Sequence, residues 1–192
     1  MARKNKYSKV KPKVSPLTYA IMAIVFIGLL LAVIFSINTP KENFNNRFGL
    51  DKDNIYELIK FKDLERKIDN DEELIVIIAF EKKSMTPASL LRELINVYDE
   101  DNKTYNESHR DNLTDVVYYL ELVDEDLITD FVDKYEVSLK TQDPMMIAFN
   151  NGEIVAEFNG AKTHETNAAN QELANLIRNI KEFLLKLNVE DN

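Results

Sequence analysis

Residues 84–88 are the stretch best placed for chemistry, because they join a predicted buried strand to a predicted helix. The strand is the apolar run LIVIIAF at residues 74–80, and the helix covers residues 87–98, where apolar side chains recur at helical spacing. In many α/β proteins this turn carries the reactive groups, since it sets a helix N-terminus at the sheet edge. Here it reads Ser-Met-Thr-Pro-Ala, without cysteine, histidine or glycine. We expect Thr86 to cap the helix and Pro87 to begin it, with no catalytic role for the turn.

Other residues suited to catalysis or metal binding are few. The chain has no cysteine, which excludes thiolate catalysis, disulfides and cysteine-based metal sites. His109 and His164 lie in polar stretches without a partner at ligand spacing, so we interpret both as solvent-exposed loop residues. Acidic clusters at residues 69–73, 99–101 and 124–126 lack the glycine and spacing of a calcium loop. We therefore predict no enzyme activity, no catalytic residue, no metal site and no cofactor.

The charge of the chain is unevenly distributed. The net charge is −9, but six of the 24 cations lie in residues 1–15, which contain no acid. The rest of the chain has 18 cations against all 33 acids, a balance of −15. Such a surface repels phosphate backbones, so we expect no nucleic-acid partner.

An uncharged apolar segment follows the basic N-terminus. Residues 17–37 would form a helix of about 30 Å, the thickness of a hydrocarbon core. A cleaved signal peptide is the closest alternative, but its apolar region would be about 7–15 residues long and end in an A-x-A-like site. The preceding cations place the N-terminus in the cytoplasm. We predict a single-pass protein of the cell membrane, with a basic segment at 1–15, a transmembrane helix at 16–37 contacting the lipid bilayer, a linker at 38–50 and an extracytoplasmic domain at 51–190.

The domain is expected to alternate strands and helices. Asn150-Asn151-Gly152 is a hairpin signal between its last two strands. Residues 99–115 form a long polar segment that we interpret as too polar to be core. The resulting order predicts a mixed sheet with helices on both faces. The expected strands are residues 55–61, 74–80, 116–123, 145–149 and 153–158, and the expected helices are residues 62–68, 87–98, 125–135 and 167–187.

This pattern resembles the thioredoxin-like superfamily over residues 51–190. Residues 85–88 stand where thioredoxins carry Cys-Gly-Pro-Cys, and only Pro87 matches. Residues 143–153, DPMMIAFNNGE, look like the family's cis-proline segment and the hairpin that follows it. The resemblance implies a thioredoxin-like three-layer α/β/α domain with a mixed central sheet. It also implies a cis peptide bond before Pro144, facing the turn.

Without cysteine, dithiol–disulfide exchange cannot occur, although the shape of the family's groove could persist. In thioredoxin-like proteins this groove holds an extended peptide by strand addition. The resemblance therefore implies a non-catalytic module that binds a peptide or a membrane-protein partner. Methionines here could instead be core, the better interpretation for whichever of Met145 and Met146 faces inward. The candidate partner-binding residues are Met85, Thr86, Pro87, Asp143, Pro144 and Met145.

Two alternatives stay open at this point. The chain could be a redox or bacteriocin-export accessory protein that acts with a thiol-bearing partner. Residues 99–115 or the apolar span could also make the partner contacts, leaving the groove vestigial. The sequence does not choose an oligomeric state, nor whether Phe44 and Phe48 pack on the domain or lie at the membrane interface.

Overall fold

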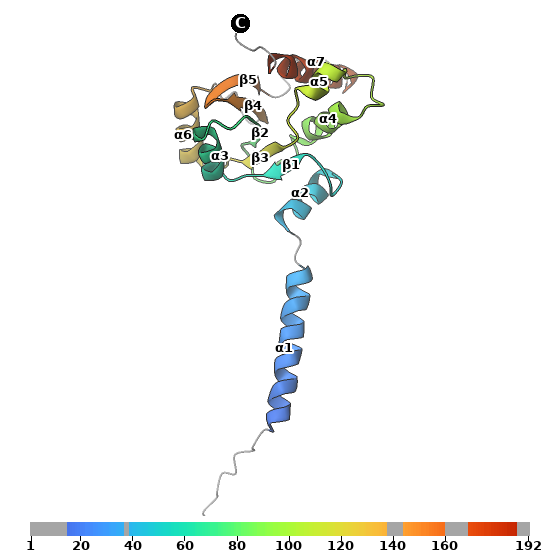
Figure 1. Ribbon diagram of the computed structural model, residues 1–192, viewed down its shortest axis with the longest axis vertical. Coiled ribbons are helices and arrows are strands. Elements are labelled where there is room, and N and C mark those ends of the chain that lie inside the picture. Colours follow the sequence, from blue (N-terminus) through green and yellow to red (C-terminus); the bar gives the residue numbers. More distant parts are fainter. Residues whose placement is uncertain (1–14, 37–38, 138–143, 160–168, 188–192) are drawn as a thin grey trace, which may run out of the picture. The chain divides into compact units, whose positions relative to one another are not determined.

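A computed structural model describes residues 15–36, 39–137, 144–159 and 169–187 (Figure 1). The chain forms two compact units, one ending at Thr39 and one beginning at Pro40. The first unit contains helix α1 (Pro16–Ser36), whose described side chains, residues 16–30, are all exposed. Over the described residues, none of the helices reaches the combination of length and apolarity that spanning a bilayer requires.

The second unit is built on a five-stranded mixed sheet in the order β1-β3-β2-β4-β5. The first three strands are parallel, whereas β4 is antiparallel to β2 and to β5. This confirms the predicted mixed α/β class. The strands are β1 (Tyr56–Leu58), β2 (Leu74–Ala79), β3 (Val117–Glu121), β4 (Met145–Asn150) and β5 (Glu153–Asn159). The helices are α2 (Pro40–Phe48), α3 (Phe61–Asp69), α4 (Ala88–Tyr98), α5 (Glu107–Asp111), α6 (Glu125–Tyr135) and α7 (Ala169–Lys186).

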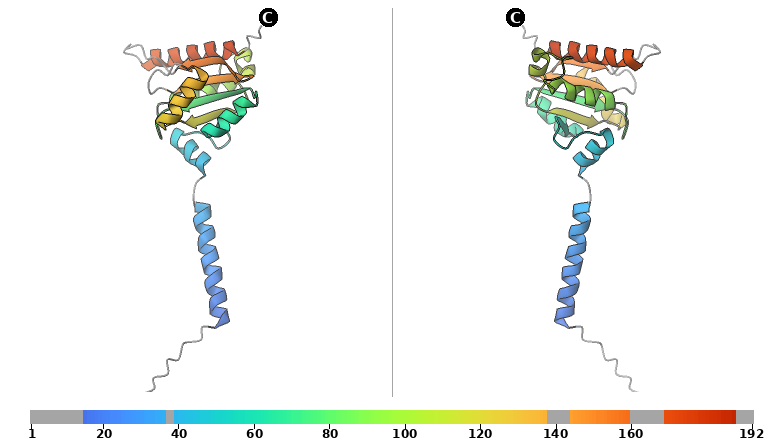
Figure 2. Two further views of the ribbon diagram at one scale, coloured as in Figure 1. Left: turned by 90° about the vertical axis from the view of Figure 1, so that its left-hand side faces the viewer. Right: turned by 90° about the vertical axis from the view of Figure 1, so that its right-hand side faces the viewer.

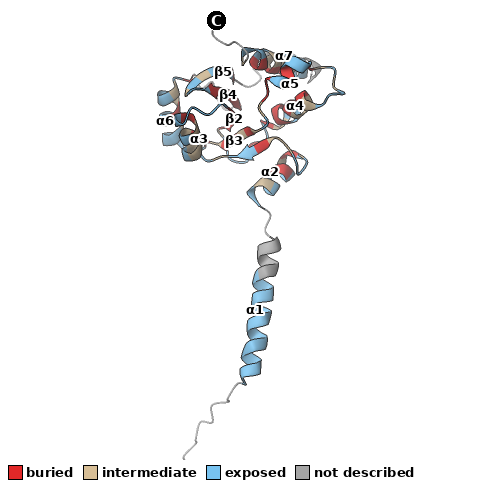
Figure 3. Ribbon diagram, viewed as in Figure 1, coloured by how far each residue is buried: buried red, intermediate tan, exposed pale blue. Residues whose placement is uncertain are grey.

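Helices cover both faces of the sheet (Figure 2). Strand β2 is buried along its whole length because its alternate side chains enter the two faces: Ile75 and Ile77 pack on one side, Val76 and Ile78 on the other. The first face is covered by α2, α4, α7 and the segment around α5, and the second by α3 and α6. The buried residues accordingly lie between the layers (Figure 3).

The prediction of a linker at residues 38–50 was wrong for its central part, which is helix α2. Phe44 and Phe48 lie four residues apart on one helix face and are 2% and 0% exposed, packed against Tyr119 of β3. Gly49 follows the helix at φ +64°, and the Leu50 N–H bonds the Asn45 carbonyl at 2.9 Å, the pattern of a glycine-terminated helix. The two phenylalanines therefore pack on the domain.

The interpretation of residues 99–115 as too polar for the core was also wrong. Tyr105 and Leu113 are 2% and 4% exposed, and helix α5 lies between them. His109, expected to be solvent-exposed, is buried and caps this helix: its N–H donates to Asn106 Oδ1 at 3.1 Å, and its Nδ1 accepts from the Asn106 N–H at 3.3 Å. Side chain–backbone bonds of this kind let a polar segment fold against the core. His164 lies outside the described residues.

The predicted hairpin is confirmed. Asn151 and Gly152 have φ of +51° and +78°, as a two-residue turn between antiparallel strands requires. The first predicted strand is shorter than expected, because β1 ends at Leu58 and α3 already begins at Phe61.

Candidate functional site

The turn after β2 differs from the predicted helix start. Helix α4 begins at Ala88, and Pro87 is its N-cap, without a capping side chain. Thr86 does not cap the helix because its hydroxyl lies 2.9 Å from Ser84 Oγ, and Ser84 Oγ also accepts the Thr86 N–H. The Ala88 N–H bonds the Met85 carbonyl at 3.0 Å and closes the turn. Met85 and Thr86 are exposed, whereas Pro87 is buried.

The other half of the predicted groove is mostly core. Pro144 is buried, and Met145 is 1% exposed and pairs with Ile78 of β2. Met146 is also buried, so both methionines are core residues. Asp143, and with it the peptide bond before Pro144, lies outside the described residues. Strand pairing places the start of β4 beside the end of β2. Among the six candidate residues, however, only Met85 and Thr86 are described as exposed.

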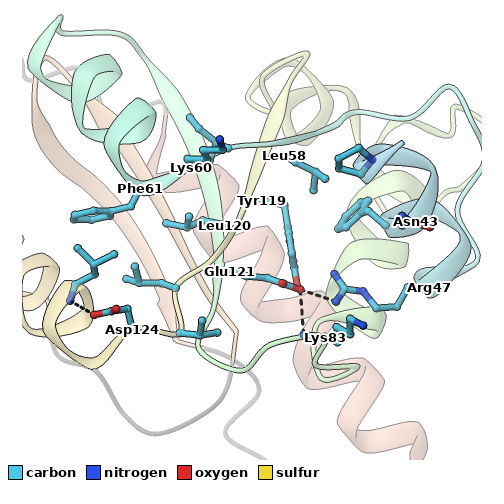
Figure 4. Close-up of a pocket in the computed structure, with 16 residues that line it drawn as sticks. Asn43, Arg47, Leu58, Lys60, Phe61, Lys83, Tyr119, Leu120, Glu121 and Asp124 are labelled. Carbon is cyan, nitrogen blue, oxygen red and sulfur yellow. Dashed lines mark hydrogen bonds and ion pairs between the residues drawn. The ribbon is translucent and has the colours of Figure 1, made fainter. Parts of the chain in front are cut away.

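The structure has an open pocket of about 760 Å³ beside that turn, at the carboxyl ends of the parallel strands β1 and β3 (Figure 4). This is where open α/β sheets commonly bind ligands. Four segments form the pocket: α2, the junction of β1 and α3, the turn after β2, and the junction of β3 and α6. Its residues are Pro40, Asn43, Phe44, Arg47, Leu58, Ile59, Lys60, Phe61, Lys83, Tyr119, Leu120, Glu121, Leu122, Val123, Asp124 and Leu127.

Much of the pocket wall is apolar and accessible. Leu58, Val123 and Leu127 are 39%, 45% and 37% exposed, although each lies beside the core of the domain. Large apolar side chains that stay exposed together mark an interaction site more often than isolated ones do. The apolar wall is therefore available to a bound molecule.

The two carboxylates of the pocket are already engaged. Glu121 Oε1 accepts from Arg47 Nη1 at 2.5 Å and from the Lys83 backbone N–H at 3.2 Å (Figure 4). Asp124 Oδ1 accepts the N–H groups of Asp126 and Leu127 at 3.1 and 3.2 Å, which caps helix α6. Glu121 thus joins α2, β3 and the turn, while Asp124 holds the start of α6.

Two buried polar atoms at the pocket have no hydrogen-bond partner among the described residues: Arg47 Nε and the Tyr119 hydroxyl. Burial raises the pKa of Tyr119 to about 12; Arg47 opposes this shift and Glu121 adds to it. The hydroxyl therefore stays protonated at neutral pH. Both groups can donate a hydrogen bond.

This site was not predicted from the sequence because it depends on α2. Arg47 and Glu121 are 74 positions apart, and nothing in local spacing pairs them. The available signals were Pro40 at a helix start, Phe44 and Phe48 at helical spacing, and a closing Gly49. We interpreted these residues as part of a linker, but their pattern is that of a helix packed on the domain.

The chain matches none of the models of known protein families, and no curated protein matches its sequence. Among the described residues, no group of three or more histidine and carboxylate side chains could hold a metal ion. The site is therefore interpreted from its own geometry: an apolar wall, three basic side chains and two engaged carboxylates.

Proposed function

We propose that this chain is a membrane-anchored, non-catalytic thioredoxin-like module that binds a peptide or a membrane-protein partner on the extracytoplasmic side. The open pocket between α2, β1, β3 and α6 is the observation that carries the proposal. Much of its exposed wall is apolar, and its polar side chains can bind and orient a ligand. Recognition is the function that such a surface serves best.

The strand order supports the thioredoxin-like part of the proposal. Strands β1, β3 and β2 are parallel, and the hairpin β4–β5 joins the sheet on the far side of β2. Helices α3 and α6 lie on one face, with α4 and α7 on the other. These features support the three-layer α/β/α domain with a mixed central sheet that the resemblance implies.

The sequence around α1 supports the anchor. Six cations precede the segment, 21 consecutive uncharged residues follow at 17–37, and the described apolar side chains of α1 are exposed. A helix that is apolar all round is stable where lipid or protein surrounds it. The basic segment before it would stay in the cytoplasm.

We assign the proposed binding surface to the neighbouring pocket instead of the predicted groove. Pro87, Pro144 and Met145 are buried, so they offer little to a partner. Lys83, from the same turn as Met85, lines the pocket instead. The turn after β2, which lacks the family's two cysteines, then forms one side of a different binding site.

Site-specific photocrosslinking tests this proposal. A photoreactive amino acid would replace Val123 in the pocket and, as a matched control, Val155 on β5; the two valines are 45% and 43% exposed. In intact membranes we expect irradiation to give a discrete crosslinked product from position 123 and none from position 155. A third variant, with the photoreactive amino acid at Met85, tests whether the predicted groove also contacts a partner. Absence of a product from position 123, or equal products from 123 and 155, would contradict the proposal.

A further inference from the structure

We infer that the pocket takes an extended peptide segment of a partner protein that combines large apolar side chains with at least one carboxylate. This inference rests on the proposed function, because it specifies what the same pocket binds. It follows from the charges at the pocket, from its hydrogen-bond donors and from their placement around the apolar wall.

The charge of the pocket differs from that of the rest of the chain. Outside the basic N-terminus the chain is strongly acidic, yet the pocket has three basic side chains, Arg47, Lys60 and Lys83, against two carboxylates. One oxygen of each carboxylate, Glu121 Oε1 and Asp124 Oδ1, is engaged by the contacts described above. The exposed lysines at the rim have no ion-pair partner among the described residues. A carboxylate-bearing ligand complements this balance.

Several groups at the pocket are able to donate a hydrogen bond to a ligand. The two ammonium groups and Arg47 Nε can only donate, and the Tyr119 hydroxyl is a buried group able to donate or accept. Helix α3 also begins at the pocket with Lys60 as N-cap and no capping side chain, in contrast to Asp124 on α6. The Asp63 N–H bonds the Lys60 carbonyl at 3.0 Å, which leaves the N–H groups of Phe61 and Lys62 without an intrahelical acceptor. A ligand must therefore bring acceptors such as backbone carbonyls and carboxylates.

The donors lie on opposite sides of the pocket. In Figure 4, Lys60 and Phe61 lie toward the α3 side, whereas Arg47 and Lys83 lie toward the α2 side, with Leu58 and Leu120 between them. A fatty acid has one acceptor group and a featureless tail, so it would leave one set of donors unused. A peptide carries a carbonyl at every residue and alternates apolar and acidic side chains. It satisfies both sides while covering the apolar wall.

A displayed library of random seven-residue peptides tests the inference on the full-length chain in nanodiscs. Selection would be run on the wild-type chain and on the double charge-reversal variant Lys60→Glu/Lys83→Glu. The matched control is Lys52→Glu/Lys103→Glu, which changes the same net charge at exposed lysines away from the pocket. We expect the wild type to enrich peptides with large apolar residues and Asp or Glu. The pocket variant should bind those peptides at least tenfold more weakly, and the control variant should bind them unchanged.

The outcomes separate this inference from the proposed function. Leu127→Glu, which places a charge in the apolar wall, identifies the peptides that bind in the pocket. If pocket-dependent peptides are enriched without acidic residues, or bind equally to the charge-reversal variant, the inference is wrong and the proposed function stands. If no enriched peptide depends on Leu127, the inference is overturned, and the proposed function is decided by the crosslink from position 123. Binding of decanoate, in place of peptides, with loss in Leu127→Glu would also overturn the inference.

Discussion

At the scale of single residues, Glu121 connects three distant parts of the chain. It accepts hydrogen bonds from Arg47 of α2 and from the backbone of Lys83 in the turn after β2, while belonging itself to β3. The side chains of Arg47 and Glu121 are 19% and 28% exposed. A half-buried pair is screened less by solvent than an exposed one, so it contributes more to stability.

We expect a double-mutant cycle of Arg47→Met and Glu121→Gln to give a coupling energy of about 1 kcal/mol in the free energy of unfolding. The control is the pair Arg178–Glu182 on α7, which is 3.9 Å apart and about two-thirds exposed. Its coupling should be near the lower limit for surface pairs, about 0.3 kcal/mol. Urea denaturation of the single and double variants measures both. Equal coupling in the two cycles would show that burial of Arg47–Glu121 has no energetic consequence.

His109 makes the stability of the domain depend on pH. Burial, and secondarily the nearby Lys181, lower the pKa of His109 in the folded state, and its Nδ1 accepts the Asn106 N–H. The unfolded chain therefore binds a proton more readily as pH falls. The stabilisation by neutral His109 is complete above about pH 6.5 and is lost as the pH falls toward the lower pKa of the folded state.

We therefore expect wild type to lose more stability than His109→Gln between pH 7.5 and pH 5. Glutamine is chosen because it can occupy the same capping position without titrating. Urea denaturation at the two pH values gives the comparison, and the carboxylates common to both proteins cancel in the difference. A pH-independent difference between the two proteins would mean that His109 protonation is not coupled to folding.

At the scale of secondary-structure elements, α2 determines whether the pocket exists. Phe48 is fully buried: its ring centroid lies 5.1 Å from that of Phe44 and 5.9 Å from that of Tyr119, and Arg47 lies over it. We expect Phe48→Ala to lower the free energy of unfolding by about 3–5 kcal/mol, the usual cost of removing a buried aromatic side chain. Asn46→Ala, on the exposed side of the same helix, should change it by less than about 0.5 kcal/mol. Thermal denaturation of both variants measures this. Similar losses would mean that α2 does not pack as described.

The hairpin between β4 and β5 depends on one glycine. Gly152 has φ +78°, and a Cβ there would lie 3.3 Å from Asp71 Oδ1. We expect Gly152→Ala to destabilise the domain by about 1–2 kcal/mol because alanine is strained in the left-handed region. Asn151→Gly, at φ +51°, should be neutral within about 0.5 kcal/mol. Chemical denaturation compares the two. A tolerated Gly152→Ala would place the turn in another conformation.

The elements that could be predicted from sequence are those with a local signal. The run at residues 74–80 and the Asn151-Gly152 turn each specify their structure within a few residues, and both were found. Helix α2 was missed because its apolar face is only Phe44 and Phe48, in a short polar segment. Residues 99–115 were misjudged because composition does not reveal buried polar groups that bond to one another, such as Tyr105 and Glu93 at 3.0 Å.

Only one side of the candidate site, the turn after β2, could be predicted from the sequence. The sequence pointed to the turn after β2, and Lys83 of this turn does line the pocket. The other walls come from α2, the end of β1 and the end of β3, which only tertiary packing brings together. Met145 was a candidate because of its place beside Pro144, but β4 lies between β2 and β5 and both of its faces are covered, so Met145 and Met146 are both buried. The sequence alone did not show that helices cover both faces of this strand.

At the scale of the whole molecule, the chain has a basic N-terminus, an apolar helix and an acidic domain that carries the open pocket. We propose that the apolar segment holds the pocket-bearing domain on the extracytoplasmic side of the cell membrane, where a partner can bind it. This proposal can be tested directly because the sequence has no cysteine. A single introduced cysteine is therefore the only thiol of the chain, and the wild type is the unlabelled control.

The decisive measurement is labelling of single cysteines with a membrane-impermeant maleimide in intact cells that express the chain. Ser8→Cys reports the basic segment, and Lys103→Cys reports an exposed position of the domain. We expect Lys103→Cys to be labelled in intact cells and Ser8→Cys to be labelled only after the membrane is permeabilised. The reverse pattern, or release of a labelled domain into the soluble fraction, would contradict it.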